Sequence, residues 1–300
     1  MLVLSEVDVK RVVQTSLRKI IDLNRKALLS LGESNSIVAD VPTRTSIPYC
    51  SNSGNNGQAL SGADCTLFKP AMYREYINGK DSEKILKASL GIKVVSVRDK
   101  NSNIGKSIVP ASTMLIDPET GSTKALMNST WLTAARTAAG SACSTEIMCL
   151  PRLFHSHREQ NIENSSYPSI EIVCFGAGLQ IEMHIAALRR SRWPSQSFLK
   201  IRKVTIVNKS IERASSLKSK LMSDIQYEED QELQPITNIS TLLLDDNEQL
   251  EEVVRGADII VTATNTLTPL FPGEWVKDGA HICGVGSYVV KLCFGFYIYY

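Results

Sequence analysis

The chain has 300 residues, 43% of them hydrophobic, and its 33 basic and 31 acidic residues leave a net charge of +2. This length and composition allow a large buried core and predict two domains. The charges are interspersed without a basic run, and no apolar run approaches the roughly 20 residues that span a bilayer, so the sequence argues against nucleic-acid and membrane partners.

The chain is predicted to open with an amphipathic helix capped by Ser5. Its apolar residues follow the i, i+3, i+4 spacing of a one-sided stripe, namely Val9, Val12, Val13, Leu17, Ile20 and Ile21. From Val41 to Pro118 the pattern changes to short β-like runs, such as Gly91 to Val97 and Thr113 to Gly121. An exposed loop is predicted over Ser51 to Gly62.

A helix rich in alanine is predicted over Ser129 to Leu150, and its small side chains permit close packing against another backbone or a ligand. Residues 1–150 are therefore predicted to form an α+β domain. The polar segment Pro151 to Pro168 is the predicted linker into a second domain.

Strands and helices alternate in the predicted second domain, residues 151–300. The predicted strands lie at Glu171 to Phe175, Val204 to Val207, near Ile236 and at Asp258 to Thr264, and the predicted helices at Gln180 to Arg192, Ile211 to Ile225 and Asn247 to Arg255. This alternation is typical of an α/β fold with a Rossmann-type, doubly wound parallel sheet.

Two glycines, Gly176 and Gly178, stand where the first strand of this domain meets its first helix. A glycine turn lets the backbone approach a ligand, and the following helix offers free N–H groups to a phosphate. The pattern matches the first two glycines of the dinucleotide-binding motif, but Ile181 stands in place of the third. The alternative interpretation is a tight turn without a ligand.

The end of the second strand lacks the acidic residue that would bind a bare ribose hydroxyl pair. Asn208, Lys209 and Ser210 stand there, followed by Arg213. Cations and neutral donors suit a 2′-phosphate better, so the sequence favours NADP(H) over NAD(H). Alternatively, Lys209 and Arg213 are solvated surface charges.

The seven cysteines include no Cys-x-x-Cys pair, which indicates reduced thiols in a cytoplasmic protein. The four histidines, at 155, 157, 184 and 281, have neither a third ligand nor a helical partner at metal-binding spacing. No metal site is predicted.

Several segments in order resemble the ornithine cyclodeaminase and mu-crystallin family. They are PTRTSIP (42–48), GIKVVSV (91–97), LIDPETG (115–121), LTAARTAAGSA (132–142), FGAGLQ (175–180), ADIIVTAT (257–264) and GEWVKDGAHICGVGS (273–287). The resemblance implies a homodimer, with an N-terminal domain for substrate binding and dimerisation and a Rossmann domain for the dinucleotide.

Site residues follow from the same resemblance. It implies that Arg44, Lys93 and Arg136 bind a substrate carboxylate, with Lys93 or a bound water as proton donor. The implied cofactor residues are Thr137, Gly176, Gly178, Gln180, Asn208, Lys209, Ser210, Arg213, Thr262, Ala263, Thr264, Val285 and Gly286.

The chain departs from the family pattern after Gly286. Cyclodeaminases carry an aspartate after this turn, whereas Ser287 and Tyr288 stand here, as in reductase-like relatives. Family members then continue with further strands and helices, but this chain ends in VVKLCFGFYIYY (289–300). We expect a sheet that is incomplete at its C-terminal end, and interpret the tail as a reading frame that enters an intron.

The sequence thus predicts an NAD(P)-dependent oxidoreductase that acts on an amino acid or cyclic imine carboxylate by hydride transfer at the α-carbon. Ornithine cyclodeamination, which yields proline and ammonia, is the alternative enzymatic function. Two functions without catalysis also fit the sequence, namely a binder of a nucleotide or small ligand and an inactive truncated product.

Overall fold

The computed structural model describes residues 1–30, 37–48, 64–76, 85–153, 155, 169–192, 198–226, 233, 235–266 and 268–285. The chain divides into two compact units, Met1–Ala134 and a second that begins at Ala135. The sequence places this boundary at residue 150, after the alanine-rich helix. In the structure that helix crosses the boundary, because the alanines from Ala135 onward are buried in the second unit. The predicted loop over 51–62 lies outside the described residues.

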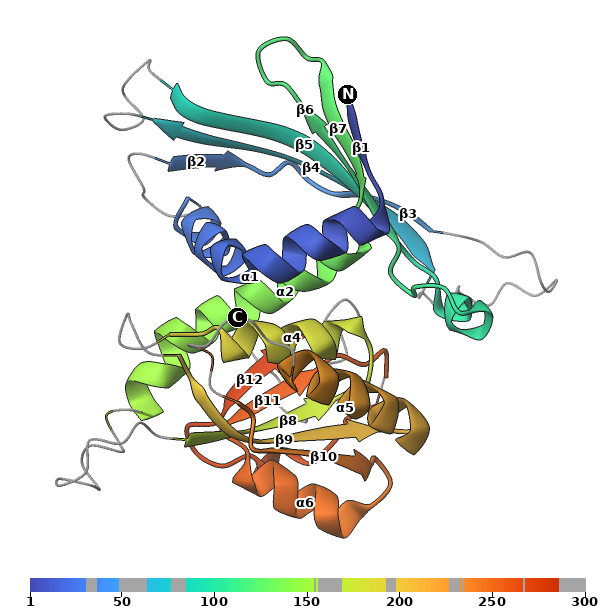
Figure 1. The fold of residues 1–300 in the computed structure, drawn as a ribbon, viewed down its shortest axis with the longest axis vertical. Coiled ribbons are helices and arrows are strands. Elements are labelled where there is room, and N and C mark those ends of the chain that lie inside the picture. The colour runs from blue at the N-terminus through green and yellow to red at the C-terminus, as the bar shows by residue number, and fades with distance from the viewer. Residues whose placement is uncertain are drawn as a thin grey trace. The chain divides into compact units, whose positions relative to one another are not determined.

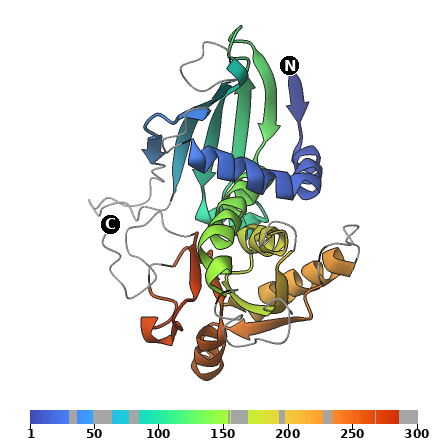
Figure 2. The same ribbon diagram turned by 90° about the vertical axis from the view of Figure 1, so that its left-hand side faces the viewer.

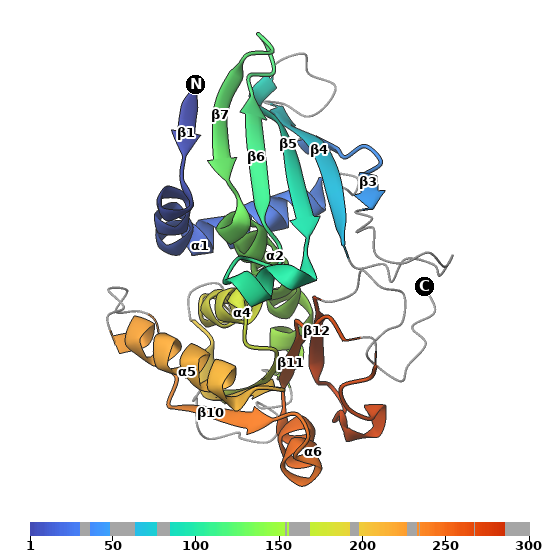
Figure 3. The same ribbon diagram turned by 90° about the vertical axis from the view of Figure 1, so that its right-hand side faces the viewer.

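The first unit contains a seven-stranded sheet of order β1-β7-β6-β5-β4-β2, with β3 also paired to β4. Its strands are β1 (Leu2–Leu4), β2 (Ile37–Asp40), β3 (Thr45–Pro48), β4 (Cys65–Tyr76), β5 (Ile85–Val97), β6 (Ala111–Ile116) and β7 (Thr123–Asn128). All pairs are antiparallel except β1 with β7. Figure 3 shows β1, β7, β6, β5 and β4 side by side.

The predicted N-terminal helix is confirmed as α1 (Glu6–Leu29). Ser5 and Asp8 form a capping box, in which the Asp8 carboxylate accepts from the Ser5 N–H at 2.9 Å and the Ser5 hydroxyl accepts from the Asp8 N–H at 3.3 Å. The apolar stripe buries Val9, Val13, Leu17 and Ile21. The helix contacts β1, β7 and β2, so it crosses one face of the sheet (Figures 1 and 2).

The alanine-rich segment forms α2 (Thr130–Ser144), which runs into a π-helical turn over Thr145–Cys149 and stays helical to residue 153. The expected polar linker therefore begins later than Pro151. The buried alanines of this helix that belong to the second unit are Ala135, Ala138, Ala139 and Ala142. Because these buried side chains are small, this part of the helix can pack closely against the elements around it, as the sequence predicts.

The second unit has the predicted alternation of strands and helices. Its elements are β8 (Ser169–Phe175), α4 (Leu179–Arg189), β9 (Lys200–Asn208), α5 (Ile211–Gln226), β10 (Asn238–Leu243), α6 (Asn247–Gly256), β11 (Ile259–Thr262), a 3-10 turn (Gly273–Trp275) and β12 (His281–Gly284). The sheet is parallel, with the order β10-β9-β8-β11-β12. This is the 3-2-1-4-5 part of the Rossmann order, so the predicted fold class is confirmed.

Both faces of this sheet are buried, which explains the near-continuous apolar character of its strands. On β8, Ile172 and Cys174 face a core shared with α4 and α5, whereas Val173 and Phe175 face a core shared with α6. The helices accordingly cover opposite faces in Figure 1. Phe175 stacks on Phe271 with 4.9 Å between ring centroids.

Some predicted boundaries differ from the structure. The helix predicted to end at Arg192 ends at Arg189, because residue 190 leaves the helical conformation and residue 192 forms an isolated bridge with Phe198. The strand predicted near Ile236 begins two residues later, at Asn238, and Ile236 is a buried residue before it.

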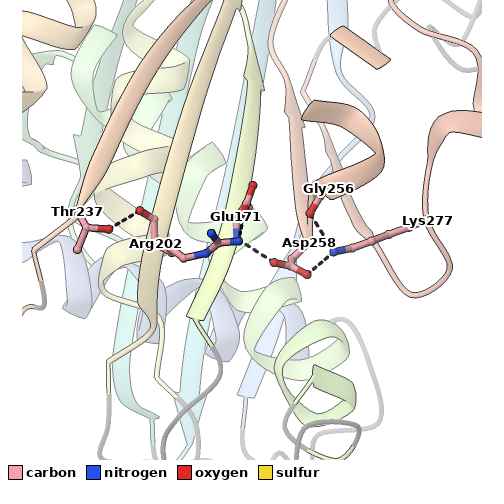
Figure 4. Close-up of polar contacts among 6 residues, drawn as sticks. All are labelled: Glu171, Arg202, Thr237, Gly256, Asp258 and Lys277. Carbon is pink, nitrogen blue, oxygen red and sulfur yellow. Dashed lines mark hydrogen bonds and ion pairs between the residues drawn. The ribbon is translucent and has the colours of Figure 1, made fainter. Parts of the chain in front are cut away.

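A polar network joins the strands of the second sheet at their amino ends (Figure 4). Asp258 accepts hydrogen bonds from the Glu171 N–H at 2.8 Å and from the Lys277 ammonium at 2.7 Å, and Lys277 also donates to the Gly256 carbonyl at 2.9 Å. Glu171 forms an ion pair with Arg202. Asp258 therefore fixes β8, β11 and the segment before β12 to one another.

Replacing Asp258 with alanine should lower the free energy of unfolding by about 1.5–3 kcal/mol, because hydrogen bonds from a backbone N–H and a charged amine are lost together. Urea unfolding measures this change. Glu251→Ala is the matched control, since it removes an exposed ion pair with Arg255 in the same unit and should cost less than about 0.5 kcal/mol. Equal losses in the two variants would contradict the role given to Asp258.

Candidate functional site

The candidate nucleotide site lies at the carboxyl ends of β8 and β11. The chain proceeds from β8 outward to β9 and β10 on one side, and then returns to β11 and β12 on the other. Ligands of doubly wound sheets bind where the strand order reverses in this way. Gly176 follows β8, and Ala263 follows β11, which lies beside β12 (Figure 3).

Gly176 lies in a conformation and a space that only glycine fits. Its φ is +114°, and a Cβ built on it would lie 2.7 Å from the Ala263 carbonyl oxygen. The backbones are also joined directly, because the Ala263 N–H donates to the Phe175 carbonyl at 2.9 Å. Gly176 therefore has a structural reason to be glycine, independent of any ligand.

Gly178 has a different environment. It is the N-cap of α4 in an extended conformation, and within the described part of the chain no side chain caps this helix. A Cβ on Gly178 would meet no atom within 4 Å. Because neither conformation nor space requires glycine here, the open position before the first N–H groups of α4 suits an anion that approaches the backbone.

Two buried polar atoms lie near these turns. Gln180 Oε1, in the first turn of α4, and Thr264 Oγ1, just after β11, have no hydrogen-bond partner among the described residues. Buried polar groups in proteins are nearly always paired, so such atoms fit a site for a polar ligand. The residues present therefore fit a dinucleotide.

Ile181, which replaces the third small residue of the motif, is fully buried in the core beneath α4. Its Cγ1 lies 3.6 Å from the Cβ position of Gly176. The helix thus packs on β8 through a branched apolar side chain, and this departure from the motif leaves the turn intact.

At the end of β9 the predicted ribose residues bond mainly to one another. Asn208 Nδ2 donates to the Ser210 carbonyl at 3.0 Å, and the Ser210 hydroxyl accepts from the Arg213 N–H at 3.2 Å while it donates to Glu212 at 2.7 Å. This hydrogen bond lowers the pKa of Glu212. The side chains of Lys209 and Arg213 are exposed. Sequence reasoning missed Glu212, an exposed carboxylate beside the expected phosphate position.

His184 links two elements of the candidate nucleotide site. Its Nδ1 lies 2.7 Å from the Gln180 carbonyl and its Nε2 lies 3.1 Å from the Ser141 hydroxyl. Since a carbonyl only accepts, Nδ1 carries the proton and Nε2 accepts from Ser141. Burial lowers the pKa of His184 to about 4, against the opposing effect of the Gln180 bond. The ring is therefore neutral near pH 7.

The remaining cofactor candidates lie on three elements of the second unit. Thr137 is half-buried on α2, one helical turn before Ser141. Thr262 is buried at the end of β11, and its carbonyl accepts from the Val285 N–H at 2.9 Å. Gly286 lies outside the described residues. Arg136, a substrate candidate on α2, is exposed.

The other substrate candidates lie in the first unit. Lys93 is half-buried on β5, with Nζ 3.4 Å from the Thr133 hydroxyl, and Arg44 is exposed just before β3. The β4–β5 pairing places Lys69 directly opposite Lys93. Sequence reasoning missed Lys69, because its position beside Lys93 depends on a pairing register between strands that are distant in the sequence.

The buried thiols near the sheet are not reactive nucleophiles. Burial raises the pKa of Cys149 to about 12 and that of Cys283 to about 11, so both stay protonated at neutral pH. In the described part of the chain, no group of three or more potential ligands could hold a metal ion. The described helices are too short or too polar to cross a membrane.

Comparison with known proteins identifies a family and several relatives that the chain resembles. A model of the ornithine cyclodeaminase/mu-crystallin family matches residues 76–151 and 236–290. An uncharacterized cyclodeaminase of Dictyostelium discoideum is 30% identical over 300 residues, covering 96% of this chain and 71% of that protein. The ketimine reductase mu-crystallin of Mus musculus is 26% identical over 223 residues, covering 74% of this chain and 58% of that protein.

A solved structure supports the fold. The Δ1-pyrroline-2-carboxylate reductase of Thermococcus litoralis, in complex with NADH and L-proline, aligns with a TM-score of 0.65 at 24% identity. The alignment covers 94% of this chain and 68% of that chain. The chain thus matches only part of the length of each of these proteins.

The buried neutral His184 predicts a loss of stability in acid. Its folded pKa lies below the ordinary value of 6.5, so its contribution is complete above about pH 6.5 and is lost as the pH falls towards 4. Between about pH 7.5 and pH 5 this loss should amount to about 2 kcal/mol.

Urea unfolding of the wild type and His184→Asn at several pH values measures this effect, because asparagine can keep a donor to Gln180 but does not titrate. Other groups titrate equally in both proteins, so the difference between the two curves reports His184. Parallel curves would show that the ring is not buried as a neutral base.

Proposed function

Because the chain belongs to the ornithine cyclodeaminase/mu-crystallin family, we propose that it is a nicotinamide-dinucleotide-dependent oxidoreductase that acts on an amino acid or a cyclic imine carboxylate. The observation that carries the proposal is the turn between β8 and α4. There Gly178 leaves open space in front of an uncapped helix end, in a sheet of Rossmann order.

The dinucleotide would be held by residues from the carboxyl ends of the strands. We assign Gly176, Gly178, Gln180 and Thr137 to the diphosphate and Thr262, Ala263 and Thr264 to the adjacent part of the nucleotide. Val285, with Gly286, is assigned to the nicotinamide side. The buried, unpartnered oxygens of Gln180 and Thr264 support this assignment, because each needs a hydrogen-bond partner.

The substrate carboxylate is assigned to Arg44, Lys93 and Arg136. Cations fix the orientation of a planar acid through charge-assisted hydrogen bonds, and orientation contributes much of the rate of such a reaction. A bound nicotinamide would supply a hydride to the imine carbon, or accept one from the α-carbon of the amino acid. The Lys93 ammonium, or a water molecule, would protonate the imine nitrogen.

Cyclodeamination is the second candidate, and the similarity to the Dictyostelium protein favours it. A third is a non-catalytic nucleotide binder, as expected for a crystallin-like protein. Assays of the full chain with an imine panel and with ornithine separate these functions. Net consumption of NAD(P)H identifies a reductase. Loss of ornithine without net consumption of the dinucleotide identifies a cyclodeaminase, and nucleotide binding without turnover of any substrate identifies a non-catalytic binder.

The proposal includes a cytoplasmic homodimer. The five cysteines that the structure describes form no disulfide with one another, which fits a reducing compartment. Sedimentation of the purified chain tests the dimer.

Gly178→Ala should weaken NAD(P)H binding at least about tenfold without lowering the free energy of unfolding, because the added methyl group enters the space left for a phosphate and touches no protein atom. Titration calorimetry and urea unfolding measure the two quantities. Gly279→Ala, at a turn with φ of +80° away from this site, is the control that should alter stability but not nucleotide affinity. Unchanged NAD(P)H binding by Gly178→Ala would refute the site.

We also propose that NADP(H) is preferred to NAD(H), through Lys209 and Arg213. Lys209→Met should weaken NADPH binding roughly tenfold and leave NADH binding unchanged, since only NADPH carries the extra phosphate. Glu212→Gln should have the opposite effect on NADPH, because a carboxylate beside a phosphate repels it. Dissociation constants for both nucleotides test this, and a wild type that binds NADH more tightly would contradict the preference.

A further inference from the structure

A buried hydrogen bond joins α2 to α4 within the second unit. The Ser141 hydroxyl of α2 donates to His184 Nε2 of α4 at 3.1 Å, and His184 Nδ1 donates to the Gln180 carbonyl at 2.7 Å. The His184 side chain is fully buried. A serine inside a helix often bonds a carbonyl of its own helix, whereas this serine bonds a ring that is 43 residues away in the sequence.

Packing alone does not explain a histidine at this position. Ile181, Ile185 and Leu188 of the same helix are buried in an apolar core. A leucine at residue 184 would also be apolar, and it would not bury two ring nitrogens that need partners. Hydrogen bonds have preferred distances and angles, so the bond between Ser141 and His184 fixes α4 on α2 more narrowly than apolar contacts would.

Both helices carry residues that are assigned to the diphosphate. Thr137 lies four residues before Ser141 on α2, so the two residues project from the same side of that helix. Gln180, whose carbonyl accepts from His184, lies in the first turn of α4 after the N-cap Gly178. The side-chain oxygen of Gln180 is buried and has no partner among the described residues. The bond therefore sets the spacing between two groups of candidate ligands.

The same serine also lies beside the last described strand of the sheet. Burial raises the pKa of Cys283 on β12 to about 11, whereas hydrogen bonds with the side chains of Ser141 and Thr145 act in the opposite direction. The Thr145 hydroxyl donates to the Ser141 carbonyl at 2.9 Å. Ser141 is thus the place where α2, α4 and β12 meet.

We propose that Ser141 and His184 are positioning residues for the dinucleotide. Their hydrogen bond fixes the first turn of α4 relative to Thr137, so that both can serve one diphosphate. The inference rests on the proposed function, which assigns Thr137, Gly178 and Gln180 to that group. The bonds that a helix N-terminus gives to a phosphate depend on distance and angle, so a small displacement of α4 weakens them.

Titration calorimetry with NADH, NADPH and ADP-ribose tests this role. Ser141→Ala should weaken the binding of all three ligands roughly tenfold, because the link between the helices is lost and His184 Nε2 has no donor. The three losses should be equal, since ADP-ribose contains the diphosphate without the nicotinamide. A loss for NADH that ADP-ribose does not share would locate the effect at β12 and overturn the inference.

Two histidine variants separate the hydrogen bond from the volume of the ring. His184→Gln keeps an acceptor near the position of Nε2 and should retain the wild-type affinity within about threefold. His184→Asn reaches only the position of Nδ1 and should lose as much affinity as Ser141→Ala. The double variant Ser141→Ala/His184→Asn should bind no more weakly than either single variant, because both changes remove the same bond. Losses that multiply would contradict the proposal.

Ser240→Ala is the matched control. Ser240 of β10 lies 3.1 Å from the Thr205 hydroxyl of β9, so the same substitution removes a hydrogen bond of equal length from the same unit. Both serine variants should lower the midpoint of urea unfolding, but only Ser141→Ala should weaken nucleotide binding. If Ser141→Ala lowers stability and leaves nucleotide affinity unchanged, its role is structural and the inference is wrong.

These results are separable from those for the proposed function. Calorimetry measures binding, so a wild type that binds nucleotides without turnover still decides the role of the pair. A wild type that binds none of the three ligands rejects the nucleotide site and the positioning role together. Tight binding by the wild type that Ser141→Ala does not weaken rejects the positioning role alone.

Discussion

The Ala263 carbonyl oxygen lies 2.7 Å from the place where a Cβ of Gly176 would stand, so the chain segments after β8 and β11 meet backbone to backbone. This contact determines the geometry of the candidate nucleotide site. It brings the two segments together at the reversal of strand order, and it directs the chain from β8 into α4 with the first turn of the helix uncapped. A side chain at residue 176 would separate the segments.

The two ends of the second sheet carry different polar groups. At the amino ends, Asp258 accepts hydrogen bonds from Glu171 and Lys277, and the polar groups satisfy one another. At the carboxyl ends, Gln180 and Thr264 keep buried oxygens without partners among the described residues. His281 Nε2, at the start of β12, also lacks a partner among the described residues, but Gln180 and Thr264 lie at the edge where ligands bind in this fold.

Local patterns predicted much of the fold. The capping residue Ser5 and the stripe after it specify α1, and the alternation of apolar runs with helical segments specifies the Rossmann-type order. The sequence did not predict the short strand β1, because it has three residues and is recognisable only through its pairing with β7. The strand near Ile236 was predicted too early in the chain, because β10 mixes the buried Ile239 and Leu242 with polar residues and has no clear apolar run.

The features of the candidate sites were likewise predictable only where they are local in the sequence. The glycine turn is a local feature, so the sequence alone located it. Lys69 and His184 could not be identified in this way, because they matter through residues that are distant in the sequence. Lys69 is paired with Lys93 on the neighbouring strand, and His184 contacts Ser141 on another helix. Those contacts depend on register and packing, which the sequence near each residue does not encode.

The π-helical turn over Thr145–Cys149 has a consequence for the face that α2 presents. A π turn accommodates one residue more than an α turn, so it rotates all later side chains about the helix axis. Here Ile147 and Met148 become exposed, whereas Cys149 and Leu150 enter the core beneath the second sheet. The additional residue in this turn thereby decides which side chains of the continuous helix enter the core, so that Cys149 and Leu150 are buried and Ile147 and Met148 are not.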